Sequence, residues 1–147
     1  MTLFLYYTIH AKDIKTMPHE IIDVFIKGGI DINQKSDKEH GQYSALHFAV
    51  DYPADFELTK ALVENGMDLN LRDEYGNTAF WNACHNYRGN VEEKTIIEYL
   101  FDKKANTEVE NDAGISVKDL IQQRGESIDD GLNPKAWDLR ELKINVN

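Results

Sequence analysis

The chain has 147 residues, 41% of them hydrophobic, and a formal net charge of −10 from 16 Lys and Arg against 26 Asp and Glu. This length and composition predict one globular domain that buries well over half of its unfolded surface. Residues 1–73 carry 7 basic and 12 acidic side chains and residues 74–147 carry 9 and 14, so neither half hides the basic face that nucleic-acid binding requires.

The first segment with a distinct pattern is the apolar run at residues 3–7. No basic residues precede it and no small-residue cleavage site follows soon after, so we interpret it as part of the fold and not as a secretion signal. No apolar run reaches the roughly 18–20 residues that a membrane-spanning helix needs. The single cysteine, Cys84, excludes an internal disulfide framework. These features predict a cytoplasmic protein without a membrane partner.

A segment that recurs every 37 or 38 residues organises the middle of the chain, at residues 21–33, 58–70 and 96–108. Each copy begins with apolar residues at helical spacing. The first two copies then reach a glycine, Gly29 or Gly66, which can take the left-handed conformation that ends a helix. The third copy has Lys104 at this position, where that conformation is less comfortable, so we expect its helix end to be looser or differently shaped.

A second recurrent segment lies upstream, at residues 44–49 and 78–83, with a partial echo at 116–121. Each begins with Ser or Thr, which cap helix N-termini, and therefore predicts a helix. The preceding residues 73–77 and 111–115 have the Asp/Asn-x-x-Gly pattern of a type I turn and predict fingers that project between repeats.

This order of turn, capped helix, second helix and glycine stop resembles the ankyrin repeat over residues 18–122. The best match is residues 73–83, continued after an insertion by 96–106, while Ser44 to His47 stand for the family's Thr-Pro-Leu-His. The chain departs from the pattern because no repeat keeps the proline, Trp81 replaces the histidine and Lys118 stands where leucine is expected. The resemblance implies an all-α ankyrin-repeat solenoid of about four helix-turn-helix repeats with divergent terminal caps.

We expect a single domain over residues 1–147. Its repeats should span about 1–36, 37–72, 73–110 and 111–125. No clear period follows Gly125, but Asn133-Pro134 is a helix start signal and predicts a capping helix at about 133–143, with Trp137 and Leu142 sealing the stack.

The stretch between Ala83 and Ile96 should lengthen the connection between two helices by about five residues. It is either a partner contact or drift in a tolerant surface loop.

Catalytic and metal-binding signals are weak. The five histidines lack His-Glu-x-x-His spacing and cysteine partners, and no phosphate-binding glycine motif follows a predicted strand. By the resemblance, His47 bridges the backbones of turn and helix. Cys84 is interpreted as a packed thiol and not as a nucleophile, because no paired base is evident. We therefore expect no enzyme activity, no cofactor and no metal.

The resemblance instead implies binding of a protein partner on a concave surface made by the fingers and the first helix of each repeat. Aromatic side chains there supply buried area and charged ones steer association. For Tyr52 and Tyr87 the alternative is packing on neighbouring loops. The expected partner-binding residues are Glu39, His40, Gln42, Tyr43, Asp51, Tyr52, Glu74, Tyr75, Asn77, His85, Asn86, Tyr87, Arg88 and Asp112.

Several acids, including Asp37, Asp73 and Asp112, fall on or beside the fingers, so part of the net charge should face the partner. This predicts a partner with a basic surface. Two interpretations remain open. The protein is an adaptor that brings a protein elsewhere, or it is an inhibitor, such as a bacterial immunity protein that neutralises a toxin domain by covering its active site.

Overall fold

The computed structural model describes residues 2–10, 18–51, 53–131, 138–142 and 144. Within these ranges the chain is helical, and its only β-pairing consists of the isolated bridges Lys35 with Ser44 and Arg72 with Thr78. The elements in chain order are α1 (Leu3–His10), α2 (Pro18–Lys27), η2 (Lys38–His40), α3 (Ala45–Val50), α4 (Phe56–Glu64), α5 (Ala79–Asn86), α6 (Val91–Asp102), α7 (Val117–Asp129) and η4 (Leu139–Glu141), where η marks a 3₁₀ turn.

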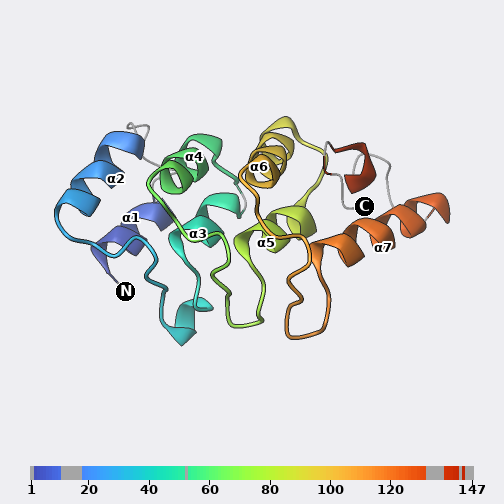
Figure 1. Cartoon of the computed structure of the whole chain (residues 1–147), viewed down its shortest axis with the longest axis horizontal. Coiled ribbons are helices and arrows are strands. Elements are labelled where there is room, and N and C mark those ends of the chain that lie inside the picture. The colour runs from blue at the N-terminus through green and yellow to red at the C-terminus, as the bar shows by residue number, and fades with distance from the viewer. Residues whose placement is uncertain (1, 11–17, 52, 132–137, 143, 145–147) are drawn as a thin grey trace.

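The helices form two parallel rows, which confirms the predicted all-α solenoid (Figure 1). In one row α1, α3, α5 and α7 pack in sequence, and in the other α2, α4 and α6 do the same. The helices α3 and α5 also pack against α4 and α6, their partners in the second row. The connections from one helix pair to the next project together on one side of the solenoid (Figure 1).

The core is one continuous cluster of apolar side chains that joins both rows and runs along the stack. Phe80 is fully buried from α5, and Leu62 and Ile97 are fully buried from α4 and α6. Each helix pair alone has an uncovered apolar face, so burial depends on the neighbouring repeat.

The three predicted N-caps are confirmed, because each hydroxyl accepts a hydrogen bond from a backbone amide of the first helical turn. The distances are 3.4 Å at Ser44, 3.1 Å at Thr78 and 3.2 Å at Ser116. These contacts are local, which explains why the sequence pattern is sufficient to predict them.

The expectation of a different helix end at Lys104 is wrong. Lys104 has φ 68°, close to the 82° of Gly29 and the 87° of Gly66. The residue after each closes the same backbone hydrogen bond, at 3.0 Å from Ala105 to Leu100 and 3.1 Å in the other two repeats. Lys104 therefore adopts the left-handed conformation that glycine has in the other two repeats. A residue with a Cβ pays a steric cost in this conformation, and the loop geometry shared by the repeats outweighs that cost.

The insertion between Ala83 and Ile96 lengthens helices and not the connection, contrary to the expectation. The helices α5 and α6 have 8 and 12 residues, against 6 and 9 in α3 and α4. The connection 87–90 is shorter than its counterpart 51–55. The cause is Asn90, whose side chain accepts from the Glu93 amide at 2.8 Å and begins α6 before Ile96.

The C-terminal part also differs from expectation. The helix α7 continues past Gly125 to Asp129. Residues 133–137 and 143 of the expected capping helix, Trp137 included, lie outside the described residues. The described part of that segment forms the 3₁₀ turn η4, with Leu142 buried. Arg140 holds it to α7 through an ion pair with Asp129 at 2.8 Å.

Candidate functional site

The connections that project from the solenoid are three fingers, which we define as residues 34–43 (finger 1), 71–77 (finger 2) and 109–115 (finger 3). Finger 2 is built around the buried carboxylate of Asp73, which accepts from the backbone amides of Tyr75 at 2.9 Å and Asn77 at 2.8 Å. In finger 3 the side chain of Asn111 accepts two backbone amides in the same way, each at 3.0 Å. The acid therefore organises the turn, and its buried carboxylate is not part of the charge that the finger exposes.

Finger 1 is three residues longer than finger 2 and is held by different hydrogen bonds. The hydroxyl of Ser36 accepts from the Tyr43 amide at 2.8 Å and donates to the His40 carbonyl at 3.0 Å. Asp37 caps the turn η2 and contacts the imidazole of His40 at 2.5 Å, and this hydrogen bond lowers the pKa of the Asp37 carboxyl. Asp37 is exposed, and its carboxylate makes hydrogen bonds within finger 1.

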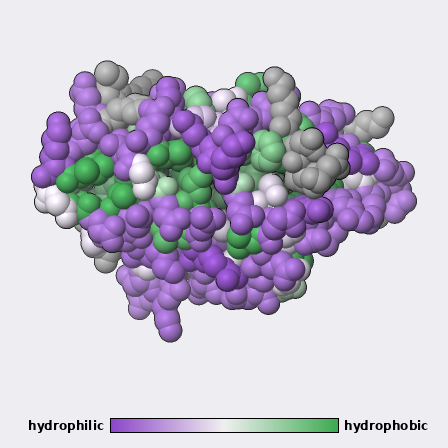
Figure 2. Space-filling view, viewed as in Figure 1, coloured by the Kyte–Doolittle hydropathy of each residue, from purple (hydrophilic) through white to green (hydrophobic). Residues whose placement is uncertain are grey.

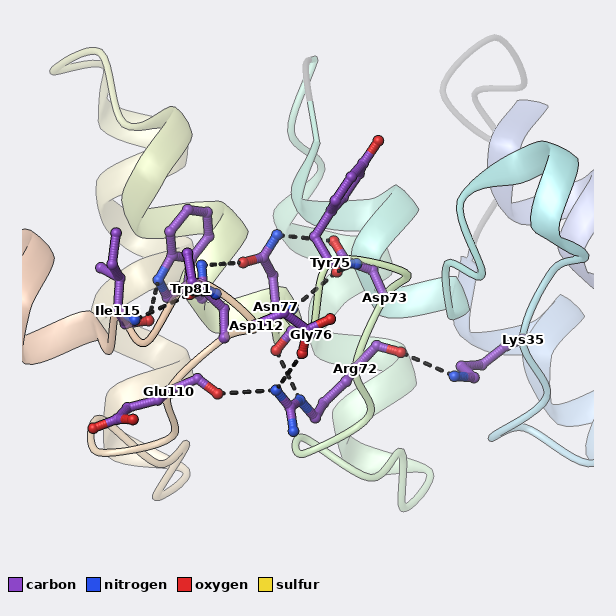
Figure 3. A network of polar contacts seen from close by, with 12 residues as sticks. Lys35, Arg72, Asp73, Tyr75, Gly76, Asn77, Trp81, Glu110, Asp112 and Ile115 are labelled. Atoms are coloured by element: carbon purple, nitrogen blue, oxygen red, sulfur yellow. Dashed lines mark hydrogen bonds and ion pairs between the residues drawn. The ribbon is translucent and has the colours of Figure 1, made fainter.

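A ladder of basic side chains connects the fingers (Figure 3). The ammonium of Lys35 donates to the backbone carbonyl of Arg72 at 3.0 Å, and the guanidinium of Arg72 donates to the backbone carbonyl of Glu110 at 3.0 Å. These three residues occupy the same position in successive repeats. The spacing of 37 and 38 residues is visible in the sequence and could have identified the ladder.

A second set of links runs from the helices to the fingers. The imidazole of His47 accepts from the Ser44 amide at 3.2 Å and donates to the Asn77 carbonyl at 3.0 Å, which confirms that it bridges turn and helix. Burial lowers the pKa of His47. Trp81, at the equivalent position, donates its indole N–H to the Ile115 carbonyl at 3.1 Å, so the replacement keeps the link.

Fingers 2 and 3 enclose an open pocket of about 440 Å³. The structure brings four of the expected partner-binding residues together here. Three further residues were not expected, although Trp81 stands out in the sequence as the aromatic at the family's histidine position. The lining residues are Glu74, Tyr75, Asn77, Trp81, Asn111, Asp112 and Ala113.

The side chains that line this pocket differ in how far they are exposed to solvent. Tyr75 is 63% exposed, and Glu74 and Asp112 are also exposed. Asn77 is buried, and its side chain donates to Asp73 at 3.2 Å and accepts from Asn111 at 2.8 Å. Asn77 therefore shapes the pocket, whereas the other three present side chains to solvent.

The expected residues of finger 1 lie apart from the pocket lining. Glu39 and His40 are exposed and Gln42 is half-buried. Tyr43 is half-buried and stacks on His47 with ring centroids 5.2 Å apart. Burial, and then the nearby Asp51, raises the pKa of the Tyr43 phenol. Tyr43 thus supports the helix beneath it and does not stand free.

The expected residues at the C-terminal ends of α3 and α5 also mostly contact other parts of the protein. Asn86 donates to Asp51 at 3.3 Å, and His85 is exposed and stacks on Trp81 at 4.8 Å. Burial, and then the charge of Arg124, lowers the pKa of His85.

Tyr87 is 6% exposed and belongs to the core, whereas the packing alternative expected it on neighbouring loops. Its carbonyl, and that of His85, accept from the guanidinium of Arg124 in α7. Arg88 is exposed, with its backbone amide donating to Glu93 at 2.7 Å. Tyr52 lies outside the described residues.

The remaining candidates for chemistry are Cys84 and groups of metal-ligating side chains. Cys84 is fully buried, as the packed-thiol interpretation predicts, and burial raises the pKa of its thiol. Over the described residues, no three His, Cys, Asp or Glu side chains are placed to hold a metal ion. None of the described helices has both the length and the apolar character needed to cross a membrane.

Comparison with known proteins identifies the repeat. The family model of ankyrin repeats in three copies matches residues 9–111. The chain is 32% identical over 118 residues to the Ankyrin repeat-containing protein P1E11.10 of Schizosaccharomyces pombe, an alignment that covers 80% of this chain and 50% of that protein. The crystal structure of EF0377, an ankyrin repeat protein, superposes with a TM-score of 0.64 at 19% identity, covering 97% of this chain and 65% of that one. The chain therefore belongs to the ankyrin repeat family, whose members generally act as protein–protein interaction modules.

Proposed function

We propose that the protein is a non-enzymatic interaction module that binds the basic surface of a protein partner. It binds through its fingers and through the row of helices α1, α3, α5 and α7. The observation that carries this proposal is the exposed Tyr75 beside the exposed carboxylates of Glu74 and Asp112 at an open pocket. An exposed aromatic supplies contact area, and carboxylates around it favour a cationic partner.

The wider surface supports the same partner. Figure 2 shows a predominantly hydrophilic surface over the fingers, whereas hydrophobic residues gather over the helices at the N-terminal end of the solenoid, α1 to α4. The net charge is −10, so long-range attraction favours association with a basic protein and weakens as salt screens it.

The ladder fixes the spacing between fingers, because each basic side chain bonds to the next finger's backbone. The surface is therefore held in place before a partner binds, which lowers the entropy lost on association.

The test is site-specific photo-crosslinking in cells of the native host. A photoreactive phenylalanine replaces Tyr75, and a matched control carries it at Val91, which is 79% exposed at the start of α6. We expect a protein crosslinked from position 75 and not from position 91. Equal crosslinking from both positions, or none from position 75, would contradict the finger surface.

The captured partner then tests the charge. Its dissociation constant should rise by about tenfold or more as salt is raised from 50 to 300 mM, because exposed charges dominate the attraction. A constant independent of salt would contradict a basic partner. If the captured protein is a toxin domain, its activity in the presence of this chain distinguishes an inhibitor from an adaptor.

A further inference from the structure

We infer that the pocket between fingers 2 and 3 is an arginine-binding site, which takes one arginine side chain of the partner. This inference rests on the proposed function and deepens it, because it assigns the chemical group that the pocket recognises. It follows from three features of the lining: two aromatic rings, two carboxylates on different fingers, and a volume of about 440 Å³ open to solvent.

The aromatic part of the lining has one exposed and one fixed ring. Tyr75 is 63% exposed, and Figure 3 shows its ring pointing away from the polar network at the finger base. Trp81 is 9% exposed, and its ring is fixed by the hydrogen bond to Ile115 and by stacking with His85. A flat cation placed against the exposed Tyr75 ring is attracted by the negative face of its π-system, while the fixed Trp81 ring forms an apolar wall of the pocket.

The two carboxylates of the lining come from different fingers. Glu74 belongs to finger 2, and among the described residues its carboxylate makes no hydrogen bond or ion pair. Asp112 belongs to finger 3 and uses one oxygen to accept from Arg72 at 3.2 Å. A second cation can therefore reach Glu74 and the other oxygen of Asp112 without displacing the ladder.

Arg72 already shows how this chain holds a guanidinium between fingers 2 and 3. Its Nε donates to the Gly76 carbonyl at 2.8 Å, and its Nη2 donates to the Glu110 carbonyl at 3.0 Å and to the Asp112 carboxylate at 3.2 Å. A side chain at position 76 would collide with Arg72 and Asp112, so Gly76 is what allows this approach. The native guanidinium occupies the base of the fingers, and the pocket above it stays open.

Arginine fits this lining better than lysine does. A guanidinium is planar, so it stacks on Tyr75 while its N–H groups point sideways to carboxylates on either finger. An ammonium is a compact, strongly hydrated charge that loses more hydration on entering and cannot pair bidentately. The pocket should therefore discriminate between the two cations and not respond to positive charge alone.

The experiment titrates the full chain with acetylated, amidated hexa-arginine and, separately, with hexa-lysine. Binding is followed by NMR through the indole N–H of Trp81, whose resonance the Trp81→Phe variant assigns. We expect saturable binding of hexa-arginine at least about fivefold tighter than that of hexa-lysine at equal salt. Equal affinities, or no saturable shift of Trp81, would overturn the inference.

Matched variants separate the pocket from general attraction. Glu74→Gln and Tyr75→Ala should each weaken hexa-arginine binding by about fivefold. Glu64→Gln removes the same charge from the exposed end of α4 and should change binding less than about twofold. If Glu64→Gln weakens binding as much as Glu74→Gln does, the attraction is nonspecific and the inference fails.

The outcome also separates this inference from the proposed function. If position 75 crosslinks a partner in cells while hexa-arginine does not bind, the finger surface stands and the arginine-binding site does not. If neither result is obtained, both proposals fail. Thermal unfolding of each variant is recorded alongside, and the exposed positions of Glu74 and Tyr75 predict midpoints close to that of the unmodified chain.

Discussion

Replacing His47 with alanine tests the link between α3 and finger 2. The side chain is fully buried, accepts from the Ser44 amide at 3.2 Å and donates to the Asn77 carbonyl at 3.0 Å. It also stacks under Tyr43 with centroids 5.2 Å apart. The substitution therefore removes the side-chain half of the capping box, a contact between repeats and a packed ring together, while the Ser44 hydroxyl keeps its backbone partner.

The magnitude follows from what each group loses. The Ser44 amide is left without its acceptor in a buried site, which costs about 1–3 kcal/mol. The Asn77 carbonyl still accepts from the Asp73 amide at 2.9 Å, so no unsatisfied acceptor is created there. With the cavity under Tyr43 added, we expect a total loss of roughly 2–4 kcal/mol. A domain with 5–15 kcal/mol, roughly the usual range, remains folded after this loss.

The same residue sets a pH dependence. Burial lowers the pKa of His47 in the folded state, so below about pH 6.5 the unfolded chain binds a proton that the folded chain refuses. Protonation would also set a new N–H against the Ser44 amide, which is itself a donor. The unmodified chain is therefore fully stabilised above that pH and loses up to about 1.4 kcal/mol per pH unit as the pH falls toward the folded pKa.

The assay is urea unfolding at several pH values between 7 and 5, followed by circular dichroism for the unmodified chain and His47→Ala. The free energy of unfolding should fall with pH more steeply in the unmodified chain, by up to about 1.4 kcal/mol per unit. His85 also has a lowered pKa but is present in both proteins, so the difference isolates His47. If the free energy of unfolding falls with pH equally in the unmodified chain and in His47→Ala, the assigned role of His47 is refuted.

Three more substitutions have defined outcomes in urea unfolding. Lys104→Gly should stabilise the chain by about 1 kcal/mol, because glycine adopts φ 68° without steric strain. The neighbouring Lys103 has φ −80°, so Lys103→Gly should destabilise the chain. Loss of stability in both variants would contradict backbone strain at Lys104. Trp81→Phe should cost about 1–2 kcal/mol through the lost indole hydrogen bond, and an unchanged midpoint would mean that this bond contributes nothing. Tyr43→Ala should cost about 1–3 kcal/mol and Tyr75→Ala less than about 0.5 kcal/mol, since only Tyr43 is packed; the reverse order would show that the assignment of the two rings is wrong.

Local features of the fold were predictable from the sequence. The caps at Ser44, Thr78 and Ser116 each contact a residue three positions ahead, so the pattern and the geometry occupy the same few residues. The early start of α6 could also be predicted from the sequence, because Asn90 is a capping residue and Glu93, three positions later, supplies the amide that it accepts.

Features that depend on neighbouring repeats were not predictable in this way. Tyr87 is buried by the stacked elements around it, including α7, whose Arg124 reaches its carbonyl from 37 positions away. Asp73 and Asn77 have the polar character of surface residues, but their side chains hold finger 2 together. Exposure at these positions depends on what packs against each finger, which a single sequence does not specify.

The ladder of Lys35 and Arg72 has a consequence for how such an array diverges. Each link ends on a backbone carbonyl, and every residue type supplies one, so the receiving position places no demand on its own side chain. Arginine receives at one step and glutamate at the next. Mutation can therefore alter one finger's chemistry without breaking its register with the finger before it, and the array can evolve new specificities one repeat at a time.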